Sequence, residues 1–262
     1  MIKVLVSGSG NMGREVLAAV ARESDMQPVA CLDALSSDEY IPVPGYDLVP
    51  LGRDAANTIT RLRPDVIVDF SNAEWTPKLA DEAVAAGVRL VIGTTGLPAD
   101  FIDHLAADCA KHHVGAVIAP NFALGAVLMQ HMSKLAAPFY EQAEIIEMHH
   151  DGKADAPSGT SIATAKAMAE GHGKAFIPPV TQKETIKGTR GGAQDGIAIH
   201  SVRLPGLVAH QQVIFGAPGE TLTIRHDSMD RASFMPGVIL AVREVMSRNE
   251  LVIGLDRLIG LT

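Results

Sequence analysis

The stretch IKVLVSGSGNMG, residues 2–13, passes from a β-branched apolar run into a glycine-rich turn. Residues 2–6 predict a buried strand, and apolar residues at helical spacing over 12–20 predict a helix directly after the turn. The turn fits GxGxxG, whose glycines allow a tight turn, close approach of the backbone to a pyrophosphate and close packing of helix on strand. The helix N-terminus adds unpaired N–H groups that suit phosphate. We therefore expect dinucleotide phosphates at Gly8, Ser9, Gly10, Asn11, Met12 and Gly13.

Asp33 supports the same interpretation. It lies 20 residues after Gly13, at the end of a strand predicted over residues 28–32. A carboxylate at this place accepts hydrogen bonds from the ribose hydroxyls of a dinucleotide and repels a 2′-phosphate. Without the glycine turn, Asp33 would be read as an ordinary surface residue. With the turn, and with Ala34 offering no cation, we expect NADH to be used at least as well as NADPH.

Strands and helices alternate through the first half of the chain. Strands are predicted over 28–32, 65–70, 88–92 and 114–119, and helices over 73–87 and 98–113. This alternation predicts a parallel sheet covered on both faces. Ligands of such sheets bind at the carboxyl ends of the strands. Each strand end alone resembles a plain turn, but together they predict a cofactor crevice lined by Phe70, Ser71, Gly93, Thr94, Thr95, Ala119, Pro120, Asn121 and Phe122.

The pattern changes in the second half. Helices are predicted over 124–139, 158–170 and 234–248, strands over 143–148, 197–202, 211–215 and 221–226, and a long excursion over 171–195. Closely spaced strands indicate antiparallel or mixed pairing, and so a second domain of α+β type. We predict a dinucleotide-binding domain of residues 1–122 plus about 232–262, and a substrate-binding and oligomerisation domain of residues 123–231.

The composition excludes several classes of protein. Lys and Arg total 22 against 30 Asp and Glu, a net charge of −8, and aromatic residues are 4% of the chain. Nucleic-acid binding needs basic surface and stacking platforms, so we expect no such partner. No apolar run approaches the roughly 18 residues of a membrane span, and the N-terminus does not resemble a signal peptide. Cys31 and Cys109 form no disulfide framework, and we expect a cytoplasmic protein.

Side chains that can carry charge or transfer protons are most concentrated in EMHHDGKADAPSGT, residues 147–160. The segment 157–160 opens a helix, whose free N–H groups and two hydroxyls predict an anion site, and Lys153 adds a positive charge. The ligand that we infer is a small anion such as a carboxylate. The alternative is that Ser158 only caps the helix while the other polar side chains are solvated or bonded locally. A metal site is disfavoured because the adjacent His149 and His150 point to opposite faces of a strand.

These motifs resemble those of the 4-hydroxy-tetrahydrodipicolinate reductase (dihydrodipicolinate reductase) family. The resemblance covers nearly the whole chain. It includes the glycine turn, residues 93–96 (GTTG), 119–122 (APNF), 147–160, 200–206 (HSVRLPG) and 231–237. The string HHxxKxDAPSGT from His149 to Thr160 is highly specific to that family. The glycine turn departs from the usual GxxGRMG, being one residue shorter with Asn11 in place of Arg.

The resemblance implies an α/β protein with a Rossmann-like, doubly wound parallel sheet and a second α+β domain on a mixed or antiparallel sheet. It implies NADH or NADPH as cofactor, a cyclic imine dicarboxylate as substrate, and a homotetramer formed through the second domain's sheet. No metal ion is implied. By position, His149 is the catalytic acid/base and Lys153 a proton donor. The substrate carboxylates are then held by His150, Ser158, Gly159 and Thr160.

Two other functions compete with this one. The chain could be another nicotinamide-dependent dehydrogenase, acting on an amino acid or an aldehyde, or an NAD-binding redox regulator without catalysis. A regulator should carry a basic DNA-binding module, which this acidic sequence does not show. An aldehyde dehydrogenase would place a reactive cysteine in its cleft, whereas Cys109 lies within a predicted helix.

Overall fold

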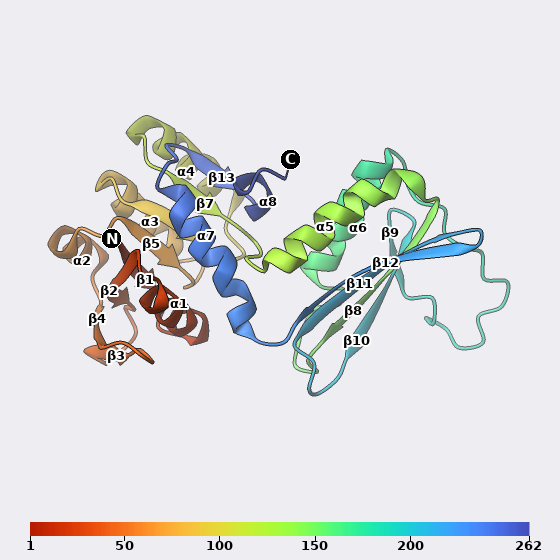
Figure 1. The fold of residues 1–262 in the computed structure, drawn as a ribbon, viewed down its shortest axis with the longest axis horizontal. Helices are drawn as coiled ribbons and strands as arrows, with labels where there is room; N and C mark the ends of the chain where they lie inside the picture. Colours follow the sequence, from red (N-terminus) through yellow and green to blue (C-terminus); the bar gives the residue numbers. More distant parts are fainter. Residues whose placement is uncertain (262) are drawn as a thin grey trace. The chain divides into compact units, whose positions relative to one another are not determined.

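The computed structural model describes residues 1–261, which fold as two compact units (Figure 1). The first unit consists of residues 1–122 together with the described residues from 234 onward, and the second of residues 123–233. The chain therefore leaves the first unit after residue 122 and returns to it for its last long helix.

The first unit contains a largely parallel sheet. Its strands are β1 (Ile2–Ser7), β2 (Met26–Leu32), β3 (Tyr40–Pro42), β4 (Leu48–Gly52), β5 (Val66–Asp69), β6 (Arg89–Ile92), β7 (Ala116–Ile118) and β13 (Leu251–Ile253). Their spatial order is β13-β7-β6-β5-β1-β2-β4-β3, and among the described residues of this sheet only the β3–β4 pair is antiparallel. The order reverses around β1, so the carboxyl ends of β1, β2 and β5 surround the point where such sheets bind ligands.

Helices cover both faces of this sheet. They are α1 (Asn11–Arg22), α2 (Ala55–Leu62), α3 (Thr76–Ala85), α4 (Ala99–His112), α7 (Met235–Val245) and the short α8 (Leu255–Leu258). Leu5, Ile67 and Leu90 of the strands pack in one core with buried residues of α2, α3 and α4. On the other face, α1 and α7 contact each other and the neighbouring strands. The prediction of a doubly wound parallel sheet is confirmed.

The second unit packs helices on one face of a mixed sheet. Its strands are β8 (Gln142–His149), β9 (Gly192–Gln194), β10 (Ile197–Arg203), β11 (Ala209–Ala217) and β12 (Glu220–Ser228), in the order β12-β11-β8-β10-β9. The pair β8–β10 is parallel and the other pairs are antiparallel. Ile145, Val213 and Phe215 form a core with Ala165 and Met168 of α6 (Gly159–His172), and α5 (Leu124–Ala136) packs beside α6. The predicted mixed sheet is confirmed.

Some elements differ from the sequence-based expectation. Residues 34–64, which carried no prediction, contain β3, β4 and α2, and β13 adds a further edge strand. The helix predicted over 124–139 ends at Ala136 and continues as the 3₁₀ helix η1 (Ala137–Phe139). A second 3₁₀ helix, η2 (Arg231–Phe234), precedes α7. Among residues 1–261, no helix is both long enough and apolar enough to cross a bilayer.

The glycine turn should be intolerant of side chains at one position and tolerant at another. A Cβ on Gly13 would lie 1.8 Å from the carbonyl oxygen of Gly8, whereas a Cβ on Gly10 would meet nothing within 4 Å. We expect Gly13→Ala to lower the free energy of unfolding by about 2 kcal/mol or more, because the obstructing atom is backbone. Gly10→Ala should lower the free energy of unfolding by less than about 1 kcal/mol. Urea denaturation of both variants checks this, and equal losses would contradict it.

Candidate functional site

A cavity of about 420 Å³ lies at the carboxyl ends of β1, β2 and β5. It is formed within the first unit by the glycine turn, the turn after β2, and the segment between β5 and α3. The lining residues are Gly8, Ser9, Gly10, Leu32, Asp33, Ala34, Leu35, Phe70, Ser71, Asn72, Glu74, Trp75 and Lys78. Five of the predicted cofactor residues therefore meet here with Asp33, which agrees with the expected position of a ligand at a switch point of the strand order.

The glycine turn is shaped to let backbone approach a ligand. Gly8 has φ of +98°, and a Cβ there would lie 2.6 Å from the carbonyl oxygen of Phe70. Gly10 precedes α1 as its N-cap, and no side chain among residues 1–261 caps this helix. The first N–H groups of α1 are thus left for a ligand, and the helix dipole favours an anion there. A cradle of this kind, next to Asp33, fits a dinucleotide.

Asp33 is held as an acceptor facing the turn. Its Oδ2 accepts hydrogen bonds from the Ser9 N–H (3.1 Å) and the Ser9 hydroxyl (2.5 Å), and its Oδ1 accepts from the Leu35 N–H (3.0 Å). Burial raises the pKa of Asp33, but the bonds from Ser9 and from backbone N–H groups outweigh it, and the net shift is downward. Asp33 is therefore ionised at neutral pH, as an acceptor for ribose hydroxyls must be.

The residues that follow β6 and β7 pack against Phe70 and Ser71, which follow β5 and line this cavity. A Cβ on Gly93 would lie 2.1 Å from the Phe70 ring, so glycine leaves room for that ring. The ring of Phe70 also packs at 5.6 Å from that of Phe122, and the Ser71 N–H donates to the Thr94 hydroxyl (3.1 Å). The remaining predicted cofactor residues do not line the cavity itself; these are Asn11, Met12, Gly13, Gly93, Thr94, Thr95, Ala119, Pro120, Asn121 and Phe122.

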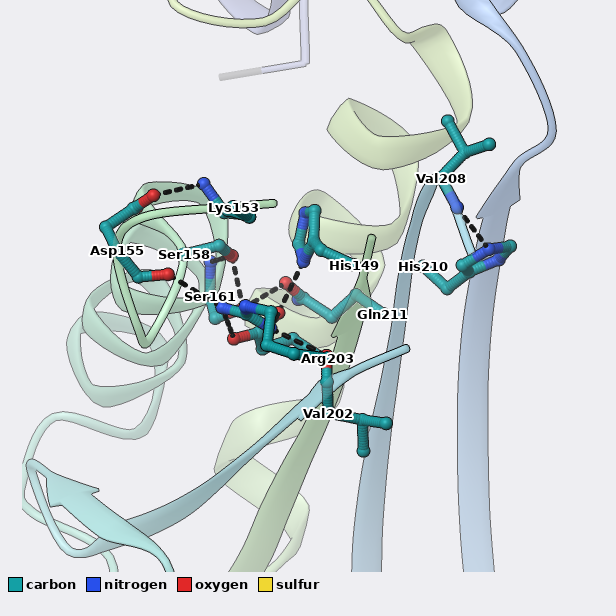
Figure 2. A network of polar contacts seen from close by, with 11 residues as sticks. His149, Lys153, Asp155, Ser158, Ser161, Val202, Arg203, Val208, His210 and Gln211 are labelled. Atoms are coloured by element: carbon teal, nitrogen blue, oxygen red, sulfur yellow. Dashed lines mark hydrogen bonds and ion pairs between the residues drawn. The ribbon is translucent and has the colours of Figure 1, made fainter. Parts of the chain in front are cut away.

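In the second unit, His149 ends β8 beside a fully buried carboxylate. Its Nδ1 lies 2.5 Å from Oε2 of Glu147, two residues earlier on the same face of the strand. Arg203 of β10, the register partner of His149, donates from Nη1 and Nη2 to the two oxygens of Glu147 at 2.9 and 2.8 Å. Figure 2 shows Arg203 also reaching the loop after β8, where Nη2 donates to the Asp155 carbonyl oxygen (2.8 Å).

The pKa shifts in this cluster have separate causes. Burial raises the pKa of Glu147, but hydrogen bonds from Arg203, Ser201 and His149 lower it by more than burial raises it. The net shift is downward, so Glu147 is ionised. Burial lowers the pKa of His149; Glu147 opposes this, while the charges of Lys153 and Arg203 add to it, and the net shift is downward. An ionised Glu147 requires a proton on Nδ1 of His149. Nε2 is then the atom left to exchange a proton with a ligand.

The start of α6 is fixed by a chain of hydroxyl and amide groups (Figure 2). Ser158 is the N-cap, and its Oγ accepts the Ser161 N–H (3.2 Å). The Ser161 hydroxyl donates to Oε1 of Gln211 (2.9 Å), whose Nε2 donates to the Thr164 hydroxyl (2.9 Å). Since the proton of Ser161 is used, Ser158 must donate in the 2.8 Å contact between their Oγ atoms. Ser158 can therefore offer an anion only its backbone N–H.

The other predicted substrate residues lie around this helix start. Lys153 is half-buried and forms an ion pair with the exposed Asp155 (2.5 Å). Gly159 and Thr160 form the first turn of α6, where backbone N–H groups are free for an anion. His150 is exposed, and its carbonyl oxygen accepts the Lys153 N–H (3.2 Å). The structure thus gathers a histidine, a lysine and a helix N-terminus on neighbouring segments.

Comparison with known proteins shows the family. The sequence profile described as "Dihydrodipicolinate reductase, N-terminus" matches residues 2–122, and that described as "Dihydrodipicolinate reductase, C-terminus" matches residues 125–259. The chain belongs to the dihydrodipicolinate reductase family. The enzymes of this family are oxidoreductases that use NAD(P)H.

Individual members of the family align over nearly their full length. The 4-hydroxy-tetrahydrodipicolinate reductase of Dehalococcoides mccartyi is 45% identical, with 99% of each chain covered. That of Geobacillus thermodenitrificans is also 45% identical, with 98% of this chain and 99% of the relative covered. The structure of dipicolinate-bound dihydrodipicolinate reductase from Paenisporosarcina sp. TG-14 superposes with a TM-score of 0.89 at 40% identity, covering 98% and 99% of the two chains. The family resemblance expected from the motifs is confirmed.

Several polar residues of these sites carried no prediction. Glu147 stood within the quoted motif, but its pairing with Arg203 joins positions 56 residues apart. Gln211 lies on β11, opposite Glu147 in the strand register. The one available signal was a charged or amide residue at an inward-facing position of an otherwise apolar strand, since such residues are buried only when they are paired.

Removing the charge of Glu147 should lower the pKa of His149 further. In Glu147→Gln, burial and the charges of Lys153 and Arg203 still lower this pKa, while the opposing carboxylate is gone. We expect NMR titration of the His149 ring to show a pKa below that of the wild type, itself below about 6.5. The variant should also lose on the order of 3 kcal/mol of unfolding free energy, because Arg203 loses its buried partner.

Glu144→Gln is the matched control for this prediction. Glu144 lies on the same strand but on the opposite face, where it bonds Arg190 and His200. Its loss should leave the His149 titration unchanged. An unchanged or raised His149 pKa in Glu147→Gln would contradict the assignment.

Proposed function

We propose that this protein reduces the cyclic imine dicarboxylate derived from 4-hydroxy-tetrahydrodipicolinate to tetrahydrodipicolinate, a step of lysine and diaminopimelate biosynthesis. NADH or NADPH supplies the hydride when bound to the first unit. The observation that carries the proposal is the arrangement at the end of β8. There, a histidine fixed by the buried Glu147 is followed within ten residues by a lysine and by the N-terminus of α6. Full-length relatives at 45% identity bear the corresponding enzyme name.

The chemistry needs a proton at the reduced ring. Hydride addition to a carbon conjugated with the imine moves electron density toward the ring nitrogen, and a proton must then be added. His149 can supply this proton from Nε2 only as the imidazolium, so Nε2 must first take up a proton from solvent. Glu147 holds the other ring proton on Nδ1, and the proton on Nε2 is then the one that passes to the substrate. Lys153 follows four residues after His149 in the sequence and is half-buried; we assign it as the second proton donor. After turnover His149 recovers its proton from solvent.

The substrate's two carboxylates explain the remaining groups. We assign one carboxylate to the backbone N–H groups of Ser158, Gly159 and Thr160 and to the Thr160 hydroxyl, where the dipole of α6 favours an anion. His150 and Lys153 supply further donors for the substrate. The dipicolinate bound to the Paenisporosarcina reductase is a ring with two carboxylates, which supports a ligand of this class. On this assignment, the first unit binds the dinucleotide and the second the substrate.

We also propose that the chain forms a homotetramer through the sheet of the second unit. Helices α5 and α6 cover one face of this sheet. The opposite face presents Ile146 and Met148 of β8, Val202 of β10 and Ile214 of β11, all half-buried in the single chain. An apolar sheet face of this kind is suited to contact with further copies of the same chain. Cys31 and Cys109 are buried free thiols, consistent with the cytoplasmic location that we propose.

Loss of the proton donor and loss of an anion-binding group should change different steady-state constants, kcat in the first case and KM in the second. We expect His149→Gln to lower kcat by about 10²–10⁴-fold with a smaller change in KM, because the lost interaction acts in the transition state. Thr160→Val should instead raise KM for the dicarboxylate by about tenfold or more, since it removes one hydrogen bond to a charged group. A coupled assay on freshly generated cyclic imine measures both. Wild-type kcat in His149→Gln would remove that residue from the mechanism.

Asp33 should set the choice of cofactor. The wild type should use NADH at least as well as NADPH, because the ionised Asp33 disfavours a 2′-phosphate. Arg53 is engaged with the carbonyl oxygens of Ser36 and Ser37, at 2.7 Å each. In Asp33→Ala, kcat/KM should fall for NADH and rise for NADPH. Strong NADPH preference in the wild type would overturn this assignment.

A further inference from the structure

Asp69 is a fully buried acid that the proposed mechanism does not use. It is the last residue of β5, where the strand opens into the segment that lines the dinucleotide cavity. No lysine, arginine or histidine among residues 1–261 forms an ion pair with it. Burying a carboxylate without a cation costs free energy unless hydrogen bonds satisfy its oxygens.

Three hydroxyl groups converge on Asp69. Ser71 Oγ donates to Oδ1 at 2.6 Å, while Thr76 Oγ1 and Thr94 Oγ1 lie 2.6 and 2.8 Å from Oδ2. They come from the turn after β5, the start of α3 and the turn after β6. The Thr94 oxygen already accepts the Ser71 N–H (3.1 Å), so its own proton is free for Asp69. One carboxylate therefore ties three segments together.

This arrangement decides what Ser71 can offer a ligand. Ser71 lines the cavity, and its single hydroxyl proton is directed at Asp69. A carboxylate only accepts hydrogen bonds, so the Ser71 hydroxyl cannot turn around and exchange roles with it. What remains on the cavity side of Ser71 Oγ is a lone pair. The geometry points to a cofactor O–H or N–H group, such as a ribose hydroxyl or a carboxamide, as the donor to Ser71.

We propose that Asp69 is a positioning residue for the cofactor, acting through Ser71 and Thr94. An amide at position 69 would present N–H donors as well as an oxygen, and the Ser71 hydroxyl could then point into the cavity. A carboxylate at position 69, which only accepts hydrogen bonds, thus keeps Ser71 an acceptor toward the cavity. This inference rests on the proposed use of a nicotinamide dinucleotide.

The chain contains its own reporter of binding. Trp75 is the only tryptophan; it lines the cavity, and its Nε1 donates to the Ser7 hydroxyl (3.1 Å). Quenching of its fluorescence by NADH gives a Kd without turnover. We expect Asp69→Asn to raise this Kd about tenfold. The matched control is Thr76→Val, which removes a hydroxyl from the same carboxylate at a buried position outside the cavity lining and should change the Kd by less than about threefold.

A double-mutant cycle separates positioning from a loss of stability. If Asp69 acts through Ser71, Asp69→Asn should weaken NADH binding far less in a Ser71→Ala background than in the wild type. Equal weakening in both backgrounds, or a wild-type Kd in Asp69→Asn, overturns the proposal. If Asp69→Asn does not fold, Thr94→Val provides the test: weaker NADH binding supports the proposal and unchanged binding overturns it. Failure of the wild type to bind either NADH or NADPH would instead overturn the proposed function.

Discussion

The bidentate ion pair between Arg203 and the buried Glu147 is the interaction on which the position and protonation of His149 in the second unit depend. Glu147 has no access to water, so its charge is tolerable only because the guanidinium binds both of its oxygens. This pairing joins β8 to β10 in their parallel register, with His149 opposite Arg203. The same guanidinium holds the loop after β8 through the Asp155 carbonyl oxygen. The strand end, the loop and the imidazole are therefore positioned by one contact.

Carboxylates at strand ends play a related part in the first unit. Asp33 directly follows β2 and bonds the glycine turn, while Asp69 ends β5 and bonds three hydroxyl groups. Each makes its neighbours donors toward itself and so determines which hydrogen-bonding groups face the cavity. Glycines provide the space that these contacts need, as at Gly93, where the Phe70 ring occupies the place of a side chain. Charge and small residues thus act together at the carboxyl edge of the sheet.

The sequence predicted most of the fold because its hydrophobic periodicity is strong where elements are buried. The strand at residues 2–6 and the helix after it follow directly from that pattern, as does the change from parallel to mixed pairing near residue 124. The edge strand β3 and its neighbour β4 carried no such signal, since they are short, partly exposed and contain Pro42 and Pro50. Strands at the edge of a sheet tolerate proline and polar residues, so their sequences do not show the apolar alternation from which strands are predicted.

The polar contacts of the sites were less accessible to sequence reasoning. Motifs placed His149, Lys153 and the start of α6 in one segment, yet the partners Arg203 and Gln211 lie about 50 residues away on other strands. Strand register brings Arg203 to Glu147, and the packing of α6 on the sheet brings Gln211 to Ser161. For Ser158 the motif suggested a ligand contact, whereas the hydrogen-bond chain through Ser161 and Gln211 directs its proton inward. Residue type alone does not specify the direction of a hydroxyl group.

The central claim is that Glu147 fixes the tautomer of His149 and leaves Nε2 to face the substrate. Nitrogen-15 NMR of histidine-labelled protein tests it most directly, with the His149 signals identified by their absence from His149→Gln. In the neutral imidazole of the free protein, we predict that Nδ1 carries the proton and that Nε2 shows the chemical shift of an unprotonated ring nitrogen. The same spectrum with the proton on Nε2 would contradict the account.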